Sequence, residues 1–393
     1  MKIICISASQ IPSNAANSIQ TMKAVNALAR LGHEVTLIVP PAAEPLPAGK
    51  DWDSLALYYG LSRRFQIEWL PSPSRRLFFL SAVRRAHRLK PDLLYVWPLQ
   101  CAVLGLLHGH PTILEMHDLP SGRVGPLYYS YFRDLAGRKR ITVITRALKK
   151  ALDERYGNVF PAQDVILSPN GVELERFVYL PGPVAARRLL GLREAPTVAC
   201  AGHLYAGRGV ELFLELARRL PDVRFVWAGG RPEDVDHWKS QAAALGLDNL
   251  LFTGFVLNER LPLYQAAADV LLMPYSREIG ISSGKGNSAL LSSPMKMFEY
   301  LATGRPIIAS DLAVFHEVLD ETNAVFCSPD KPIDWEGALR GLLDNRERRE
   351  TLGKQAHLDA QKYSWTERAR RILDGFVPNP VPVREKVGNT GEL

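Results

Sequence analysis

An ammonium, a carboxylate and a hydroxyl recur at helical spacing within the apolar stretch LSSPMKMFEYLATGRPIIASD, residues 291–311. At about 100° per residue, Lys296, Glu299 and Thr303 share one narrow face of a helix. An ammonium near a helix N-terminus attracts anions, and a carboxylate accepts hydrogen bonds from hydroxyl groups. One interpretation is a polar seam that faces a ligand cleft; the other is a surface Lys296–Glu299 pair in water.

The residues around this seam predict where its helix begins and ends. Ser293 is suited to cap the helix, Pro294 to begin it and Gly304 to stop it, so we expect a helix over 294–303. The run at 307–309 is apolar throughout, as in a strand buried on both faces of a parallel sheet.

Three further segments carry residues suited to binding. AGHLYAGRGVE, 201–211, lets backbone approach a ligand, and its Arg208 can reach phosphate oxygens. LEMHDL places His117 between carboxylates at the end of an expected strand, where a cleft role and a structural role are both open. The long polar loop 276–293 is expected to fold over a diphosphate. No GxGxxG or P-loop sequence occurs, which disfavours dinucleotide-binding and P-loop proteins.

Acidic triplets and cysteines give no sign of a metal. Residues 51–53 and 234–236 are DxD-like, but the first triplet lies in a Pro-rich connection and the second fits the first turn of a helix, where acids are favoured anyway. The 4 cysteines stand singly, without CxxC spacing. We expect no metal and no cofactor.

Composition indicates a globular protein with two domains. With 393 residues, 47% hydrophobic and 23% charged, the chain exceeds one ordinary core. No apolar run approaches the ~20 residues of a membrane span and no signal peptide is evident, so we expect a cytoplasmic protein.

The net charge of +7 gathers in residues 63–90, where arginines interleave with Leu77, Phe78 and Phe79. This segment predicts either a basic helix that meets an anionic membrane surface, at the inner face, or an ordinary amphipathic helix with its arginines in water. No motif for nucleic-acid binding accompanies it, and we expect no nucleic-acid partner.

Apolar runs alternate with helical patterns in two successive series, which predicts an α/β fold of two doubly wound, Rossmann-like domains facing a cleft. The expected strands lie at 2–7, 34–39, 93–97, 112–116 and 141–145, then at 197–201, 223–228, 250–252, 270–273, 307–309 and 324–327. The domains are expected over 1–175 and 176–362, with a helix at about 363–376 crossing back to the first and a disordered tail at 377–393.

Together these segments resemble the retaining glycosyltransferases of the GT-B fold, family four. The resemblance covers most of the chain and rests on SPMKMFEYLATGRPIIASD (293–311) above all, with AGHLYAGRG (201–209), FTGFV (252–256), ADVLLMPYS (268–276), LARLGHEVTLI (28–38) and SPNGVELERF (168–177). It implies a nucleotide-sugar donor of UDP or GDP type held mainly by the second domain, a glycan or polyprenyl-linked acceptor held by the first, and hexosyl or related transfer between them.

The resemblance also implies roles for single residues. Glu299 matches the glutamate that holds the ribose hydroxyls, Arg208 matches the basic residue on the diphosphate, and Lys296 with the helix N-terminus supports the same anion. His117 matches a histidine near the donor sugar. The remaining expected donor contacts are Gly202, His203, Gly230, Val256, Ser293 and Met295.

Three departures from the family pattern leave two hypotheses. Leu291 stands where the family has a glutamate that grips the donor sugar, so that contact is missing or comes from another residue such as Glu278. His203 replaces an arginine, and NAANS at 14–18 replaces a Gly-Gly loop, a variation associated with bacterial surface polysaccharide synthesis. The first hypothesis is a metal-independent retaining glycosyltransferase; the second is a catalytically silent GT-B protein that binds nucleotide or glycan as a partner. A third hypothesis, which does not rest on these departures, is another two-domain enzyme such as a nucleotide-sugar epimerase.

Overall fold

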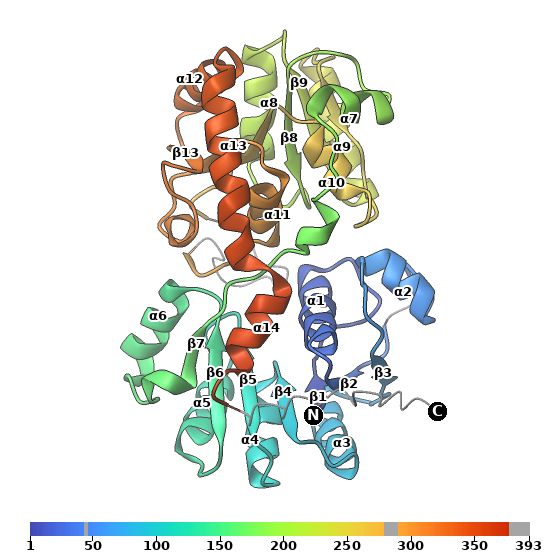
Figure 1. The fold of residues 1–393 in the computed structure, drawn as a ribbon, viewed down its shortest axis with the longest axis vertical. Helices are drawn as coiled ribbons and strands as arrows, with labels where there is room; N and C mark the ends of the chain where they lie inside the picture. The colour runs from blue at the N-terminus through green and yellow to red at the C-terminus, as the bar shows by residue number, and fades with distance from the viewer. Residues whose placement is uncertain (43–45, 279–289, 377–393) are drawn as a thin grey trace, which may run out of the picture.

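The chain folds into two lobes, each built on a parallel β-sheet with helices on both faces (Figure 1). The structure is a computed structural model that describes residues 1–42, 46–278 and 290–376. The predicted fold class, two doubly wound Rossmann-like domains, is confirmed. Most of the loop expected to cover a diphosphate, at 279–289, and the tail expected to be disordered, at 377–393, lie outside the described residues.

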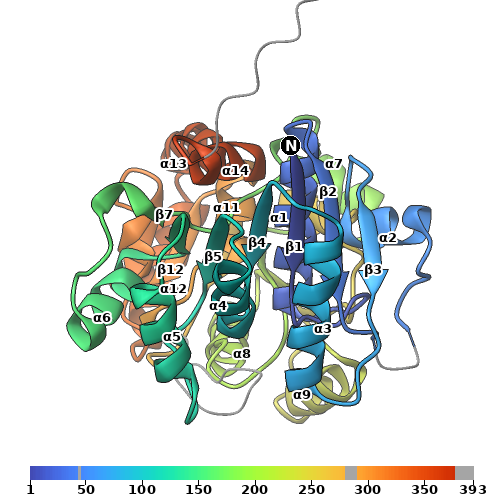
Figure 2. The ribbon, with the colours of Figure 1, turned by 90° about the horizontal axis from the view of Figure 1, so that it is seen from below.

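In the described part of the first lobe, a 7-stranded parallel sheet has the order β3-β2-β1-β4-β5-β6-β7. Its strands are β1 (Lys2–Ile6), β2 (Glu34–Val39), β3 (Gln66–Trp69), β4 (Leu93–Val96), β5 (Thr112–Met116), β6 (Lys139–Val143) and β7 (Val165–Leu167). The helices between them are α1 (Ala16–Arg30), α2 (Trp52–Tyr59), α3 (Arg75–Arg88), α4 (Leu99–Leu107), α5 (Gly125–Asp134) and α6 (Arg146–Tyr156). Figure 2 shows α3, α4 and α5 along one face of this sheet, the face on which Phe78 and Phe132 are buried.

The second lobe holds a 6-stranded parallel sheet, counted over the described residues, in the order β10-β9-β8-β11-β12-β13. Its strands are β8 (Thr197–Ala201), β9 (Arg224–Ala228), β10 (Leu250–Phe252), β11 (Val270–Met273), β12 (Ile307–Ser310) and β13 (Ala324–Cys327). Its helices are α7 (Pro183–Leu189), α8 (Val210–Arg219), α9 (Pro232–Ala244), α10 (Leu261–Ala266), α11 (Met295–Thr303), α12 (Pro332–Leu343) and α13 (Arg346–Ala360). The strand order reverses between β8 and β11, and ligands of open parallel sheets bind outside the carboxyl ends of strands at such a switch point.

The chain crosses back to the first lobe after α13. The last described helix, α14 (Trp365–Leu373), packs against α1, and Trp365 and Ile372 are buried in the first lobe's core (Figure 1). Arg140 of β6 donates a hydrogen bond to the carbonyl oxygen of Ile372 at 2.8 Å. The domain boundary drawn at residue 175 stays a prediction.

Direct contacts join the two lobes. The ring of Tyr58 stacks on that of Phe255, with the centroids 5.8 Å apart. Glu317 of the second lobe accepts hydrogen bonds from the backbone N–H groups of Arg146 (2.6 Å) and Ala147 (2.8 Å), at the start of α6. A carboxylate is favoured there because the first N–H groups of a helix lack intrahelical partners.

Several elements differ from the predictions made from sequence. The strands β3 and β7 and the helix α2 were not expected, and the strand expected at 141–145 is β6, which begins earlier. Residues 51–53 do not lie in an irregular connection: Asp51 is the N-cap of α2, and its carboxylate accepts a hydrogen bond from the Ser54 N–H at 2.9 Å. The triplet at 234–236 does lie in the first turns of a helix, α9.

The basic segment forms α3, but its aromatic residues do not face solvent. Phe78 and Phe79 are buried in the first lobe's core, whereas Leu77 and Leu80 are 47% and 39% exposed. Arg84 and Arg88 are exposed on the same helix. None of the helices in the described part of the chain is long and apolar enough to cross a membrane.

Candidate functional site

The turn after β8 approaches its neighbours too closely for any side chain. Gly209 has φ +83°, and a Cβ there would lie 1.7 Å from the carbonyl oxygen of Pro274, just after β11. A Cβ on Gly229, in the turn after β9, would lie 2.6 Å from the carbonyl oxygen of Gly202. Glycine is therefore required for these three turns to meet at the switch point of the second sheet.

Two cations converge on Tyr275 at this switch point. Arg208, in the turn after β8, donates a hydrogen bond to the Tyr275 hydroxyl at 2.5 Å, and its guanidinium carbon lies 4.7 Å from the ring centroid. The ammonium of Lys296, in the first turn of α11, lies 4.9 Å from the same centroid. Neither cation forms an ion pair with any described residue. Two cations held together without a carboxylate are suited to binding an anion.

The N-terminus of α11 differs from the prediction in its cap. The N-cap residue is Pro294, and no side chain caps the helix, because Ser293 is engaged elsewhere. The Ser293 hydroxyl accepts a hydrogen bond from the backbone N–H of Asn170 at 3.1 Å, and its carbonyl oxygen accepts one from the Asn170 side chain at 2.6 Å. Ser293 as an N-cap was thus wrong, while Gly304 ends the helix as expected. A helix start without a side-chain cap keeps N–H groups available to an anion.

Glu299 is hydrogen-bonded to Gln265 of α10. Its carboxylate accepts a hydrogen bond from the Gln265 amide at 2.9 Å, and Thr303 donates to the carbonyl oxygen of Glu299 at 2.8 Å. Lys296 and Glu299 form no ion pair in the described structure, and both are only partly exposed. The interpretation of a surface Lys296–Glu299 pair is therefore wrong, and the seam lies against the second lobe's own turns.

His203 joins the turn after β8 to the first lobe. Its Nε2 lies 3.2 Å from the carbonyl oxygen of Asn14, and its ring stacks on Tyr205 with the centroids 4.9 Å apart. Burial lowers the pKa of His203, and the nearby Arg231 and Arg208 lower it further, against the hydrogen bond to Asn14. A neutral His203 adds no charge to the Arg208 and Lys296 pair.

His117 lies at the carboxyl end of β5, hydrogen-bonded to a buried carboxylate. Its Nε2 lies 2.7 Å from Glu115 Oε1, and the Glu115 side chain is 0% exposed. Arg368 of α14 donates to both oxygens of that carboxylate, at 2.7 and 3.2 Å. Burial alone would raise the pKa of Glu115, but Arg368 and His117 outweigh it and hold the pKa well below its usual range.

The remaining predicted contacts are placed as follows. Gly230 has φ +111°, which strains any other residue, and a Cβ there would lie 2.6 Å from a Leu204 methyl carbon. Val256 packs against the second lobe's core and Met295 against the first lobe's core. Gly202 approaches Lys296, because a Cβ on it would lie 3.4 Å from the ammonium. No hydrogen bond or ion pair of the described residues joins His117 to these second-lobe residues.

Sequence reasoning missed three residues of this region. Tyr275 stands in the ADVLLMPYS motif, but nothing in the motif shows that both cations meet on its ring. Arg368 and Glu317 contact the first lobe from positions remote in the sequence, and no local pattern marks them.

Comparison with known proteins identifies the family. The family model described as "Glycosyltransferase Family 4" matches residues 19–176, and that described as "Glycosyl transferases group 1" matches residues 195–345. The chain belongs to the group 1, family 4 glycosyltransferases. Its two Rossmann-like lobes match the GT-B fold of glycosyltransferase structures.

Solved structures and curated relatives resemble this chain at low sequence identity. Anabaena Alr3699/HepE in complex with UDP superimposes with a TM-score of 0.71 at 16% identity, over 95% of this chain and 98% of that one. The alpha-D-kanosaminyltransferase of Streptomyces kanamyceticus is 29% identical over 45% of this chain and 44% of its own length. The D-inositol 3-phosphate glycosyltransferase of Corynebacterium aurimucosum is 26% identical over 82% of this chain and 70% of its own length. The chain thus spans 44% of the length of the kanosaminyltransferase and 70% of the length of the D-inositol 3-phosphate glycosyltransferase.

Proposed function

We propose that this family member is a retaining glycosyltransferase that moves a hexosyl or related group from a UDP- or GDP-sugar to a glycan or polyprenyl-linked acceptor. The observation that carries the proposal is the convergence of Arg208 and Lys296 on Tyr275, beside the N-terminus of α11 and at the switch point of the second sheet. The structural neighbour Alr3699/HepE forms complexes with UDP and with UDP-glucose, and one relative is named for teichuronic acid biosynthesis. A role in bacterial surface polysaccharide synthesis fits those names.

The diphosphate of the donor would lie between the two cations and the start of α11. Both cations are tethered to Tyr275, which is 1% exposed, so they are held in place before the ligand arrives. Glu299 would accept hydrogen bonds from the ribose hydroxyls, with Gln265 fixing one carboxylate oxygen at 2.9 Å and leaving the other for the sugar. His117 would contact the donor sugar from the first lobe.

The reaction breaks the bond between the sugar's anomeric carbon and the diphosphate oxygen, and forms one to the acceptor oxygen on the same face. Negative charge grows on the leaving diphosphate, where Arg208, Lys296 and the N–H groups of α11 stabilise it. The acceptor's proton passes to a leaving phosphate oxygen, so no metal and no protein base is required. Contacts such as that of His203 with Asn14, at 3.2 Å, close the lobes and limit hydrolysis of the donor by water.

The acceptor would be presented at an anionic membrane surface that α3 contacts. Leu77 and Leu80 are exposed on the same helix as Arg84 and Arg88, and apolar side chains flanked by arginines suit the boundary between headgroups and lipid chains. Vesicles with anionic lipid should bind the protein at low salt, and Arg84→Glu with Arg88→Glu should abolish that binding. Equal sedimentation with neutral vesicles would remove the membrane from the proposal.

A thermal-shift screen of nucleoside diphosphates and their sugars tests the donor site directly. A ligand that binds the native state raises the melting temperature by mass action, by about 2.7 kcal/mol at 100 times the Kd. We expect one base series to stabilise the wild type and Glu299→Ala to lose most of that stabilisation. Glu175→Ala is the matched control, because Glu175 is an exposed glutamate paired with Arg30 outside the seam.

Turnover with the stabilising donor then tests the reaction. Transfer to an acceptor, or slow donor hydrolysis, supports the enzyme, and product with the donor's anomeric configuration supports retention. Binding without either reaction favours the silent partner, and no stabilisation by any nucleotide at millimolar concentration would refute the donor site.

A further inference from the structure

The most completely bonded polar side chain near the site is one that touches no substrate in the proposed mechanism. Glu115 accepts hydrogen bonds from the Gln20 amide (2.5 Å), the Tyr95 hydroxyl and both terminal nitrogens of Arg368, in addition to its contact with His117. These donors come from α1, β4 and α14. An acceptor-only carboxylate surrounded by donors is held in one orientation.

Stability alone does not account for this arrangement. A buried ion pair contributes little to stability compared with apolar side chains of the same volume, since removing two charges from water is costly. Arg368 also donates from Nε to the carbonyl oxygen of Pro169 at 2.9 Å, in the segment that leads to the second lobe. The network therefore connects the segment between the lobes to the carboxylate of Glu115, which contacts His117.

The geometry at His117 fixes which ring nitrogen carries the proton. An ionised carboxylate can only accept, so the 2.7 Å contact requires His117 Nε2 to be the donor. In the neutral ring Nδ1 is then the acceptor. Among the described residues no hydrogen bond uses Nδ1, and the His117 side chain is 30% exposed, so this nitrogen is available to a ligand.

We propose that Glu115, held by Arg368, is the positioning residue of His117: it selects the tautomer with the proton on Nε2, so that Nδ1 accepts a hydrogen bond from a hydroxyl of the donor sugar. The inference rests on the proposed function for the identity of that hydroxyl. The tautomer itself depends only on the network.

The first test reads the tautomer without any turnover. Protein labelled with ¹⁵N-histidine, near pH 8, should show His117 with a proton on Nε2 and a bare Nδ1; His117→Ala identifies its signals among the 9 histidines. A proton on Nδ1 in the wild type would overturn the inference, even in a protein that transfers no sugar. The tautomer is measured on the wild type, and His117→Ala, a change at a partly exposed side chain, serves only to assign the signals.

The second test separates positioning from structure by kinetics. Glu115→Gln keeps the shape but replaces one acceptor oxygen by a donor, and we expect kcat to fall on the order of 10²-fold with the donor KM within about threefold. In the His117→Ala background the same change should alter kcat by less than about threefold, because its target is gone. Equal losses in both backgrounds would mean that Glu115 does not act through His117.

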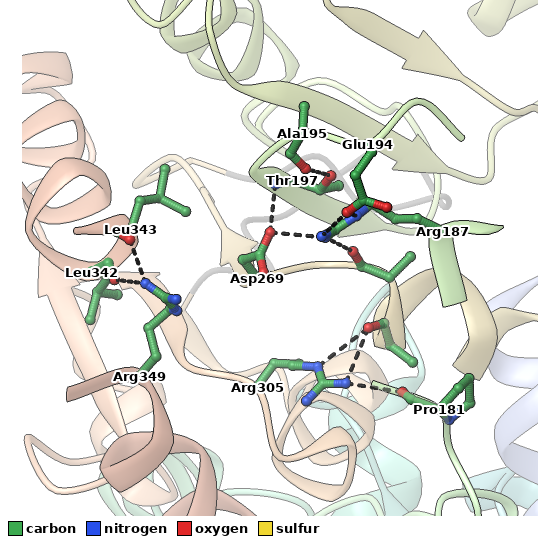
Figure 3. A network of polar contacts seen from close by, with 12 residues as sticks. Pro181, Arg187, Glu194, Ala195, Thr197, Asp269, Arg305, Leu342, Leu343 and Arg349 are labelled. Atoms are coloured by element: carbon green, nitrogen blue, oxygen red, sulfur yellow. Dashed lines mark hydrogen bonds and ion pairs between the residues drawn. The ribbon is translucent and has the colours of Figure 1, made fainter. Parts of the chain in front are cut away.

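Arg187→Met is the matched control for loss of a buried ion pair. Arg187 is buried in the second lobe and donates to Asp269 at 2.9 Å and to Glu194, as Figure 3 shows. Asp269 lies at the amino end of β11, at the opposite end of that strand from the site. We expect this variant to lower the melting temperature and to leave kcat and the His117 tautomer unchanged below that temperature. A tenfold fall in its kcat would mean that any buried ion pair of the chain affects turnover, and the kinetic argument for Glu115 would fail.

Discussion

Gly209→Ala should disable the proposed donor site by separating the two segments that hold Arg208 and Tyr275. The substituted Cβ would lie 1.7 Å from the carbonyl oxygen of Pro274, whereas ordinary contact begins at 3.4 Å. The difference, 3.4 − 1.7, requires the turn after β8 and the segment after β11 to move apart by about 1.7 Å. The backbone fixes the position of the Cβ, and its partner is a backbone carbonyl oxygen, so no side-chain rotation relieves the clash.

This displacement falls directly on the binding geometry. Arg208 precedes Gly209 and Tyr275 follows Pro274, so the 2.5 Å hydrogen bond between guanidinium and phenol breaks when the segments separate. A misplacement of about 1 Å costs on the order of 10²-fold in rate. We therefore expect a loss of about 10²-fold or more in kcat/KM, together with a weaker thermal shift by nucleoside diphosphates.

Gly246→Ala is the matched control. Gly246 also has a left-handed backbone, with φ +67°, but a Cβ there meets nothing within 4 Å. It carries the cost of a left-handed alanine, roughly 1–2 kcal/mol, without a clash. Wild-type nucleotide binding in Gly209→Ala, or equal losses in both variants, would refute the argument from close approach.

Three further predictions follow from single contacts. Tyr300→Phe should cost about 1–3 kcal/mol, measured by thermal unfolding, because the Ala201 N–H loses its 2.7 Å acceptor in the core; an unchanged melting temperature would contradict this. Glu317→Gln should speed hydrogen exchange at the Arg146 and Ala147 amides relative to Glu321→Gln, an exposed neighbour, and equal protection would show that the contact between the lobes is not formed in solution. Because the pKa of Glu115 is lower in the folded protein, its contribution to stability is complete above the unfolded value of about 4.3 and declines as pH falls below it; the melting temperature of the wild type should therefore fall more steeply in acid than that of Glu115→Gln, and parallel curves would argue against the network.

Strands buried on both faces were the elements that the sequence predicted best. The expected ranges 112–116, 197–201 and 270–273 coincide with β5, β8 and β11, because parallel strands read as short, continuous apolar runs. The missed strands β3 and β7 lie at the two edges of the first sheet and are only partly buried, so their residues need not be apolar. The edge strands β10 and β13 of the second sheet were nevertheless predicted, at 250–252 and 324–327, so an edge position alone does not explain the two missed strands.

Buried charged residues account for the other errors in the first lobe. The strand β6 begins with Lys139 and Arg140, and Arg140 is buried because its guanidinium donates to carbonyl oxygens of α14 and stacks on Phe376. An arginine with such partners looks like a surface residue in the sequence. Its burial depends on a segment more than half the chain away, so the periodicity of the local sequence does not indicate that this arginine is buried.

Sequence reasoning about the candidate site reached only residues that lie close together along the chain. Lys296 and Arg208 both lie against the ring of Tyr275, whereas Glu299 accepts a hydrogen bond from Gln265 of α10. That this polar stripe faces a ligand cleft stays a prediction. Ser293 was assigned to the helix cap because serine favours that position, but its contact with Asn170 overrides the preference. The contact with Asn170, and not the local preference of serine for helix caps, decides the conformation of Ser293.

The structure gives a physical reason for leucine at position 291, where the family resemblance led us to look for glutamate. Leu291 packs against the core of the first lobe, and its carbonyl oxygen accepts a hydrogen bond from the Thr145 hydroxyl at 3.0 Å. The same hydroxyl caps α6, whose next N–H groups are held by Glu317, so position 291 belongs to a contact between the lobes. A carboxylate there would enter an apolar surface without a partner, which is unfavourable. Leucine at 291 therefore favours this contact between the lobes.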